Sequence, residues 1–196
     1  MGKFNILSNR MKKIKYILAS LVLTIGFTSC ETEAIDEKVL DETTPGMPIL
    51  RFELNDQQTV VTDKVTFAWT RGDAFTLTAK FSVVNEADSN PETRYTPATL
   101  TISYNNFAMA YFPTKLSLDN PNNYVSSPVL EIQGVGRFSA SNAKENQKTG
   151  YSNITSINDQ ARYIGGDFNY ILYPPEGSTL TPQRLTVGSF NYIHYE

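Results

Sequence analysis

Apolar and polar residues alternate with a period of two over much of the chain, from about residue 49 to its end. Residues 65–69 read Val-Thr-Phe-Ala-Trp, and residues 75–81 read Phe-Thr-Leu-Thr-Ala-Lys-Phe. Successive side chains of a β-strand point to opposite faces, so this period predicts strands with one buried face. The β-branched and aromatic residues in the runs favour the same conformation. Further strands are expected over 100–104, 129–132, 154–157, 163–173 and 185–195.

Turn-forming residues separate these runs. They include Asn55-Asp56, Arg71-Gly72-Asp73, Asn105-Asn106 and Pro174-Pro175-Glu176-Gly177. No stretch after Cys30 shows the period of a helix of three turns. Short strands joined by regular turns are typical of an antiparallel β-sandwich. We therefore expect residues 48–196 to form one all-β domain, a single antiparallel sandwich or, as the alternative, a flattened barrel.

The N-terminal stretch has the features of an export signal. Three lysines within residues 12–15 precede an apolar run over 17–27, which ends in small residues before Cys30. A helix that spans a membrane needs about 20 apolar residues, so this shorter run predicts a secretory signal peptide over residues 1–29. Met1 and Met11 are both open as the start of the chain.

The residues before Cys30 resemble the lipobox of bacterial lipoproteins. Phe27-Thr28-Ser29-Cys30 has two small residues before the cysteine and Phe where Leu is usual. In that family the chain is cut before the cysteine and the thiol is diacylated. Cys30 is the one cysteine of the chain, so we expect it to hold the protein on a membrane, each buried CH₂ contributing ~0.8 kcal/mol. The alternative is an ordinary signal peptide in which Cys30 has no role.

Residues 30–47 are expected to form a flexible tether. Six acidic residues and one lysine lie between Glu31 and Pro48, and the stretch offers little apolar surface for a core. Acidic residues directly after the lipidated cysteine resemble the surface-export signal of Bacteroidota lipoproteins. That resemblance implies an outer-membrane protein that faces the cell exterior. A plain acidic spacer is the alternative, and display on the inner or the outer leaflet stays open.

The charge balance bears on the partners. Residues 1–29 contain five basic residues and no acidic ones, so their removal changes the formal net charge from −3 to −8. Proteins that bind nucleic acid need clustered Lys and Arg side chains against the phosphates. We therefore expect a membrane partner through Cys30 and no nucleic-acid partner.

Three runs near the C-terminus share a theme: Gly150-Tyr-Ser-Asn-Ile154, Gly166-Asp-Phe168-Asn-Tyr170 and Gly188-Ser-Phe190-Asn191. Together with the lipobox, they are similar to the closing strands of small uncharacterised Bacteroidota lipoproteins, a family carried as a domain of unknown function. The likeness covers residues 150–196 and the N-terminus, and does not extend over 52–141. It implies a location and a β fold, and it implies no chemistry.

Two of these runs predict a specific strand pairing. Residues 166–170 and 188–192 both follow the pattern Gly-x-Phe-Asn-Tyr, and a proline-rich loop over 174–182 separates them. A hairpin folded symmetrically about Ser178 places Gly166 opposite Phe190 and Phe168 opposite Gly188. Each ring would then cover the bare backbone of the glycine across from it, an arrangement that stabilises glycine in sheets.

Residues that carry catalytic chemistry are scarce. The chain has one His and one Cys, and we assign His194, close to the C-terminus, a structural or solvent-facing role. The Asx-rich stretch 119–123 lacks the acidic spacing and the glycine of a calcium loop. Arg71-Gly72-Asp73 is an adhesion tripeptide that fits an ordinary hairpin turn better. We expect no catalytic site, no metal and no cofactor.

The tyrosines indicate a second class of function that the chain could have. Ten remain after residue 29, and exposed tyrosines on a sheet can stack on sugar rings, although a buried ring with a wet hydroxyl is the commoner role. Trp69 is expected in the core. We expect a non-catalytic binding or structural module of the outer membrane. The alternative is a glycan-binding accessory beside an outer-membrane transporter, with Tyr163, Tyr173 and Tyr195 as ligand-face aromatics.

Overall fold

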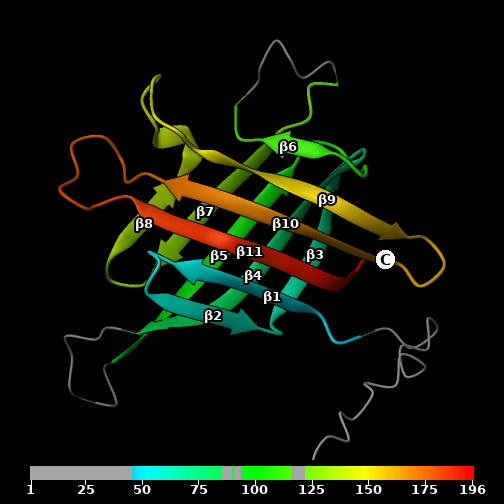
Figure 1. Cartoon of the computed structure of the whole chain (residues 1–196), viewed down its shortest axis with the longest axis horizontal. Coiled ribbons are helices and arrows are strands. Elements are labelled where there is room, and N and C mark those ends of the chain that lie inside the picture. Colours follow the sequence, from blue (N-terminus) through cyan, green and yellow to red (C-terminus); the bar gives the residue numbers. More distant parts are fainter. Residues whose placement is uncertain (1–45, 85–89, 91–93, 116–121) are drawn as a thin grey trace, which may run out of the picture. The chain divides into compact units, whose positions relative to one another are not determined.

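In the computed structural model, the described residues are 46–84, 90, 94–115 and 122–196. The expected signal peptide, Cys30 and all but the last two residues of the expected tether lie outside them, and so do residues 119–121 of the Asx-rich stretch. The described residues form two antiparallel β-sheets packed face to face (Figure 1). The prediction of an all-β sandwich is confirmed.

Within the described part of the chain, the first sheet has six strands. Their order across the sheet is β2 (Gln58–Thr62), β1 (Ile49–Leu54), β11 (Gln183–His194), β10 (Tyr163–Leu172), β9 (Gly150–Asn158) and β6 (Tyr111–Pro113). In Figure 1 its strands β9, β10 and β11 cross in front of the second sheet.

The second sheet has five strands in the same part of the chain. Their order is β3 (Val65–Arg71), β4 (Ala74–Val84), β5 (Tyr95–Tyr104), β7 (Ser126–Ile132) and β8 (Gly136–Ser139). A single 3₁₀ turn, η2 (Ala140–Asn142), follows β8.

Each predicted strand lies within or close to an observed one. The turn at Gly72, whose φ is +59°, joins β3 to β4 as expected. No separate strand was predicted for β1, although it lies at the start of the alternating part of the chain, or for β2, β6 and β8. The last three have five, three and four residues. Strands of that length carry one or two apolar residues on the buried face, too few for a period to be recognised.

The β10–β11 hairpin has the predicted register. Gly166 lies opposite Phe190, and Phe168 lies opposite Gly188. The register shifts on both sides of this pair, because β11 has one extra residue relative to β10 at each place. The bulged stretches of β11 contain Val187 (φ +50°) and Tyr192 (φ +54°), both in the left-handed region. The predicted symmetry therefore holds only for the central segment.

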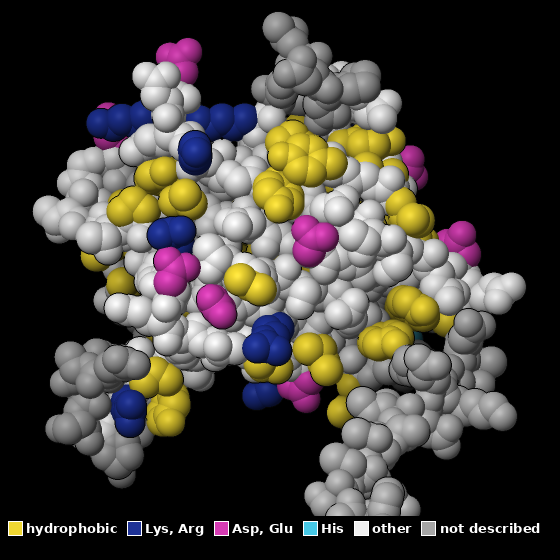
Figure 2. Space-filling view, viewed as in Figure 1, with side chains coloured by type: hydrophobic (Ala, Val, Ile, Leu, Met, Phe, Trp, Pro, Cys, Tyr) yellow, Lys and Arg dark blue, Asp and Glu magenta, His cyan; other side chains and the backbone are white. Residues whose placement is uncertain are grey.

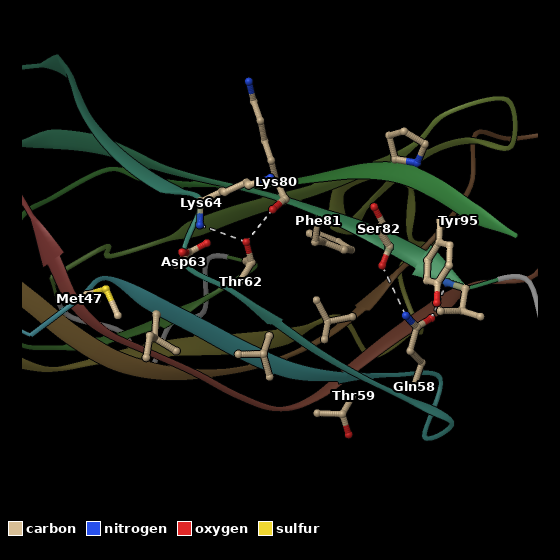
Figure 3. A pocket seen from close by; sticks show the side chains of 15 residues that line it. Met47, Gln58, Thr59, Thr62, Asp63, Lys64, Lys80, Phe81, Ser82 and Tyr95 are labelled. Carbon is tan, nitrogen blue, oxygen red and sulfur yellow. Dashed lines mark hydrogen bonds between the residues drawn. The ribbon is translucent and has the colours of Figure 1, made fainter. Parts of the chain in front are cut away.

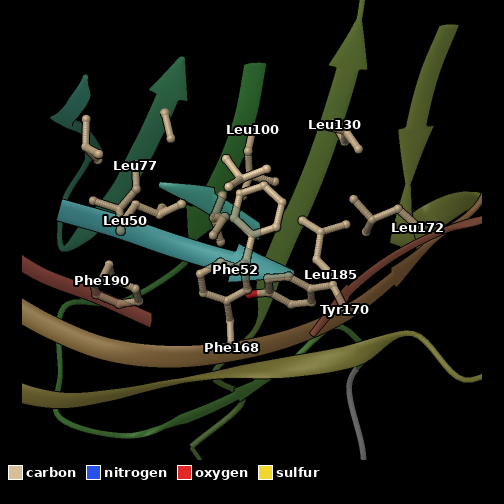
Figure 4. Close-up of a cluster of buried hydrophobic side chains, with 14 of the residues drawn as sticks. Leu50, Phe52, Leu77, Leu100, Leu130, Phe168, Tyr170, Leu172, Leu185 and Phe190 are labelled. Carbon is tan, nitrogen blue, oxygen red and sulfur yellow. The ribbon is translucent and has the colours of Figure 1, made fainter. Parts of the chain in front are cut away.

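The core lies between the sheets and is built from their inward-facing residues. Figure 4 shows Phe52, Phe168 and Tyr170 of the first sheet facing Leu100 and its neighbours on the second sheet. Full burial of a side chain of this size contributes about 1.5–3 kcal/mol relative to exposure. Every residue of this buried cluster lies between Leu50 and Ile193, so residues 49–196 contain both sheets and all of the core that the described residues form.

Two tyrosines cross the core and bind serines of the opposite sheet. Tyr104 of β5 and Ser152 of β9 share a hydrogen bond of 2.8 Å between their hydroxyls. Tyr170 of β10 donates to Ser126 of β7 at 3.2 Å. Ser152 donates to the carbonyl of Asp167 at 3.0 Å, so its one proton is committed and Tyr104 is the donor to it. Burial raises the pKa of both phenols above the ordinary value.

The prediction that Trp69 lies in the core is wrong. Trp69 points to the core side of β3, as the alternation predicted, but its side chain is 43% exposed. The reason is that β3 is an edge strand and Trp69 lies near its end. Its ring meets Phe67 and Phe107 edge-on, and its indole N–H donates to the backbone oxygen of Glu196 at 2.8 Å.

Candidate functional site

Of the three tyrosines suggested as a ligand face, Tyr163 and Tyr195 both contact Asn158, whereas Tyr173 lies apart from them. Tyr163 begins β10 and contacts the ring of Tyr192, with ring centroids 5.1 Å apart. Tyr173 follows the other end of β10, where its hydroxyl donates to the carbonyl of Lys148 at 2.9 Å. The structure therefore does not bring Tyr163 and Tyr173 together.

Tyr195 belongs to an aromatic cluster between the sheets. Its ring contacts Phe67, Trp69 and Phe107, and its hydroxyl donates to a carboxylate oxygen of Asp159 at 2.8 Å. Partial burial and the nearby Asp159 raise the pKa of Tyr195 to about 12. This side chain packs as part of the fold.

A different pair of tyrosines is exposed on the outer face of the first sheet. Tyr111 of β6 is 54% exposed and Tyr151 of β9 is 36% exposed. Their ring centroids are 5.2 Å apart, and the ring planes are inclined by 36°. Figure 2 shows this side of the molecule, with hydrophobic side chains gathered over β6 and the adjoining part of β9.

The strand register surrounds this pair with polar side chains. Across the sheet, Tyr111 lies opposite Asn153, which lies opposite Asp167. In the next row, Pro113 lies opposite Tyr151, which lies opposite Asn169. We call these six residues the tyrosine face. Asn153 donates to the Asp167 carboxylate at 3.4 Å, and Asp167 is the one charged member.

The local sequence explains why these side chains point outward. Phe112 is fully buried, so its neighbours Tyr111 and Pro113 face the opposite side of the sheet. Ser152 is also fully buried, which turns Tyr151 and Asn153 outward. β6 is the edge strand, and Ser126 holds it by donating to the carbonyl of Phe112 at 2.9 Å. The sequence signal for this face was the three-residue run Tyr-Phe-Pro, which is too short to reveal a strand.

A cleft of about 740 Å³ lies elsewhere, where β2 of the first sheet meets the last residues of β4, beyond the part of β4 that pairs with β3 (Figure 3). Thr62 donates its hydroxyl proton to the carbonyl of Lys80 at 2.7 Å. The Gln58 side chain accepts from the amide of Val84 at 3.0 Å and donates to the carbonyl of Ser82 at 3.4 Å. Side chains of β2 thus bind the backbone of β4 at this seam. We call this the β2–β4 cleft.

Groups that could hold a metal do not gather in the described part of the chain. Within it, no three His, Cys, Asp or Glu side chains are placed to bind an ion together. His194 is exposed at the end of β11.

The described residues contain no helix that is both long enough and apolar enough to cross a bilayer. Comparisons with protein-family models, with curated proteins and with solved structures found no match for this chain.

Proposed function

We propose that this protein is a non-catalytic binding module that takes neutral carbohydrate on the tyrosine face. The observation that carries the proposal is the exposed pair Tyr111–Tyr151 lying within one strand spacing of Asn153, Asp167 and Asn169. Aromatic rings and hydrogen-bonding side chains are presented together, on neighbouring strands and towards the same side.

The chemistry of sugars fits this combination of aromatic rings and hydrogen-bonding side chains. A pyranose ring has a face of C–H groups and an edge of hydroxyls, so it needs an apolar platform beside donors and acceptors. The rings of Tyr111 and Tyr151 supply the platform. An amide offers both a donor and an acceptor, and the Asp167 carboxylate accepts from hydroxyl protons.

The face is held ready for a ligand. All three of its strands are fixed by backbone pairing, and tyrosine has two rotatable side-chain bonds, so little conformational freedom is lost on binding. Asp167 and a formal charge of −8 after residue 29 disfavour acidic sugars. We therefore assign neutral glycans as the ligand class.

The location belongs to the same proposal. The lipobox-like Cys30, the acidic stretch behind it and the resemblance to Bacteroidota lipoproteins support an outer-membrane lipoprotein facing the exterior. A glycan bound there would be passed to an outer-membrane partner. A protein ligand on the tyrosine face is the second candidate, because tyrosine is enriched at protein interfaces.

Affinity electrophoresis of residues 31–196 tests the ligand class. This stretch keeps both sheets and the buried cluster of the described residues. Gels containing starch, xylan, mannan or laminarin probe neutral glycans, and gels containing polygalacturonate probe an acidic one. We expect retardation by at least one neutral polymer and none by polygalacturonate.

A matched pair of variants tests the surface. The double variant Tyr111→Ala/Tyr151→Ala should weaken binding about tenfold or more, which corresponds to 1.4 kcal/mol. Tyr95→Ala is the control, since Tyr95 is 57% exposed but lies in the β2–β4 cleft. An equal loss of glycan binding in the double variant and in Tyr95→Ala would overturn the assignment of the tyrosine face. Retardation by polygalacturonate alone would overturn the assignment of neutral glycans.

A further inference from the structure

Exposed apolar side chains gather at the β2–β4 cleft. Met47, Ile49, Val61 and Tyr95 line it and are among the eleven large hydrophobic residues exposed in the described part of the chain. Met47 is 74% exposed and Val61 is 61% exposed. An exposed apolar cluster of this kind commonly marks an interaction surface.

The cleft lies where the chain enters the domain. Met47 is the last residue of the expected tether and also lines the cleft. The 18 residues from Cys30 to Met47 span at most about 60 Å when fully extended. Among the residues that line the cleft, Met47 is the nearest to Cys30 along the chain.

The charge at the cleft differs from that of the rest of the chain. Lys64 and Lys80 line it against one acid, Asp63, whereas the chain after residue 29 has a formal charge of −8. Lysine stems cover apolar surface while the ammonium groups reach the headgroup phosphates of a lipid surface. Tyrosine is likewise enriched where bilayer and water meet.

We propose that the β2–β4 cleft is a membrane-docking surface for anionic phospholipid, on which the domain rests beside its own anchor. Met47, Val61 and Tyr95 enter the boundary between headgroups and acyl chains, and Lys64 and Lys80 contact phosphate. The lipid anchor expected at Cys30 would hold this surface beside the bilayer, and the proposal is independent of glycan binding on the tyrosine face.

Pairing with an added peptide strand fits the cleft less well. Thr62 and Gln58 already bind the backbone of β4 at Lys80, Ser82 and Val84. A strand entering between β2 and β4 would have to break these bonds before forming its own. Docking on lipid leaves them in place.

Site-specific fluorescence in the anchored protein tests the proposal. Cys30 is the one cysteine of the chain, and its thiol is blocked once acylated, so an introduced cysteine is labelled alone. The acylated Val61→Cys and Val187→Cys chains are labelled with an environment-sensitive dye. Both are then placed in vesicles of phosphatidylethanolamine and phosphatidylglycerol that contain brominated acyl chains as the quencher. Val187 is the matched control, because it is 73% exposed on the same sheet and does not line the cleft.

We expect the dye at position 61 to be quenched at least twofold more than the dye at position 187. Replacing phosphatidylglycerol by phosphatidylcholine should reduce that difference, because it removes the anionic partner of the lysines. Equal quenching at the two positions would overturn the docking surface.

Sedimentation of unacylated residues 31–196 with the same vesicles separates docking from anchoring. Val61→Asp should lower the bound fraction at least threefold, and Val187→Asp should leave it unchanged. Binding lost in Val61→Asp alone supports the surface even if acyl labelling shows that Cys30 is unmodified. An unchanged bound fraction in Val61→Asp would overturn it even if Cys30 is acylated.

Discussion

The ring of Phe168 on β10 lies directly over the bare backbone of Gly188 on β11. A Cβ atom added at Gly188 would approach the Phe168 ring to 2.4 Å. Gly166 and Phe190 form the mirror arrangement two pairs further along, where an added Cβ would approach the Phe190 ring to 2.7 Å. The two glycines are thus structural and serve the packing of the hairpin.

Gly188→Ala should destabilise the domain by about 1–3 kcal/mol, because the methyl group displaces a buried ring. Urea unfolding followed by tyrosine fluorescence measures the change. Combining it with Phe168→Leu tests the cause. The double variant should lose less free energy of unfolding than the two single variants lose in sum. Strictly additive losses of stability would contradict a direct contact.

Val187→Asn should stabilise the domain by about 1 kcal/mol. Val187 has φ +50° in a bulge of β11, a conformation that costs a β-branched residue roughly 1–2 kcal/mol and that asparagine tolerates. The midpoint of thermal unfolding gives the readout. Val61→Asn is the control, since Val61 is an exposed valine of the regular strand β2, and there the same change should lower stability. A lower midpoint of thermal unfolding for both variants would contradict backbone strain at Val187.

Ser152→Ala should cost more stability than Tyr104→Phe. Removing Ser152 leaves the buried hydroxyl of Tyr104 without its acceptor, at a cost of about 1–3 kcal/mol. Removing the Tyr104 hydroxyl leaves Ser152 its bond to the carbonyl of Asp167, so the loss should be closer to 1 kcal/mol. Equilibrium unfolding of both single variants checks this order. The reverse order would mean that Tyr104 is the acceptor.

Alkaline titration should show tyrosines that ionise above the ordinary pKa of 10.0. Burial raises the pKa of Tyr195 from 10.0 to about 12, and raises those of Tyr104 and Tyr170 as well. A folded-state pKa above the unfolded one stabilises the fold below pH 10. For Tyr195 this contribution is lost as the pH rises from 10 to about 12. Tyrosinate absorbance of the protein minus that of Tyr195→Phe isolates this residue. Asp159→Asn should lower its pKa, and an unchanged value would contradict the role of Asp159.

Cys30→Ala should abolish acyl labelling, because it removes the one thiol that the lipid needs. Metabolic labelling with a fatty-acid analogue in a bacterial host that makes lipoproteins, followed by gel fluorescence, provides the readout. Ser29→Ala is the control and should still be labelled, since it keeps a small residue before the cysteine. Equal labelling of Cys30→Ala would contradict lipidation at this position.

The sequence predicted what depends on local patterns. The β10–β11 register was correct at Phe168 because a repeat of glycine and phenylalanine specifies which residues face each other. The alternation also placed Trp69 on the correct side of β3, yet it did not reveal that β3 is an edge strand, so Trp69 was wrongly expected to be buried.

The candidate site could not be predicted because it depends on long-range pairing. Tyr111 and Tyr151 meet only because β6 pairs with β9, and no local period encodes that contact. Which tyrosines are exposed also depends on which strands form the edges. Sequence reasoning identified the residue type and missed the positions.

The edges of both sheets bear on how readily two copies of this protein could pair edge to edge. The outer strands β6 and β8 are short, and β6 ends in Pro113, which has no N–H to offer a neighbouring chain. The side chains of Gln58 and Thr62 form hydrogen bonds with the backbone of β4 beyond the part of that strand that pairs with β3. Long bare edges are templates for aggregation between chains. Of the four edge strands in the described part of the chain, β3 is the longest with seven residues, so it offers a second copy the longest strand edge on which a cross-chain sheet could grow.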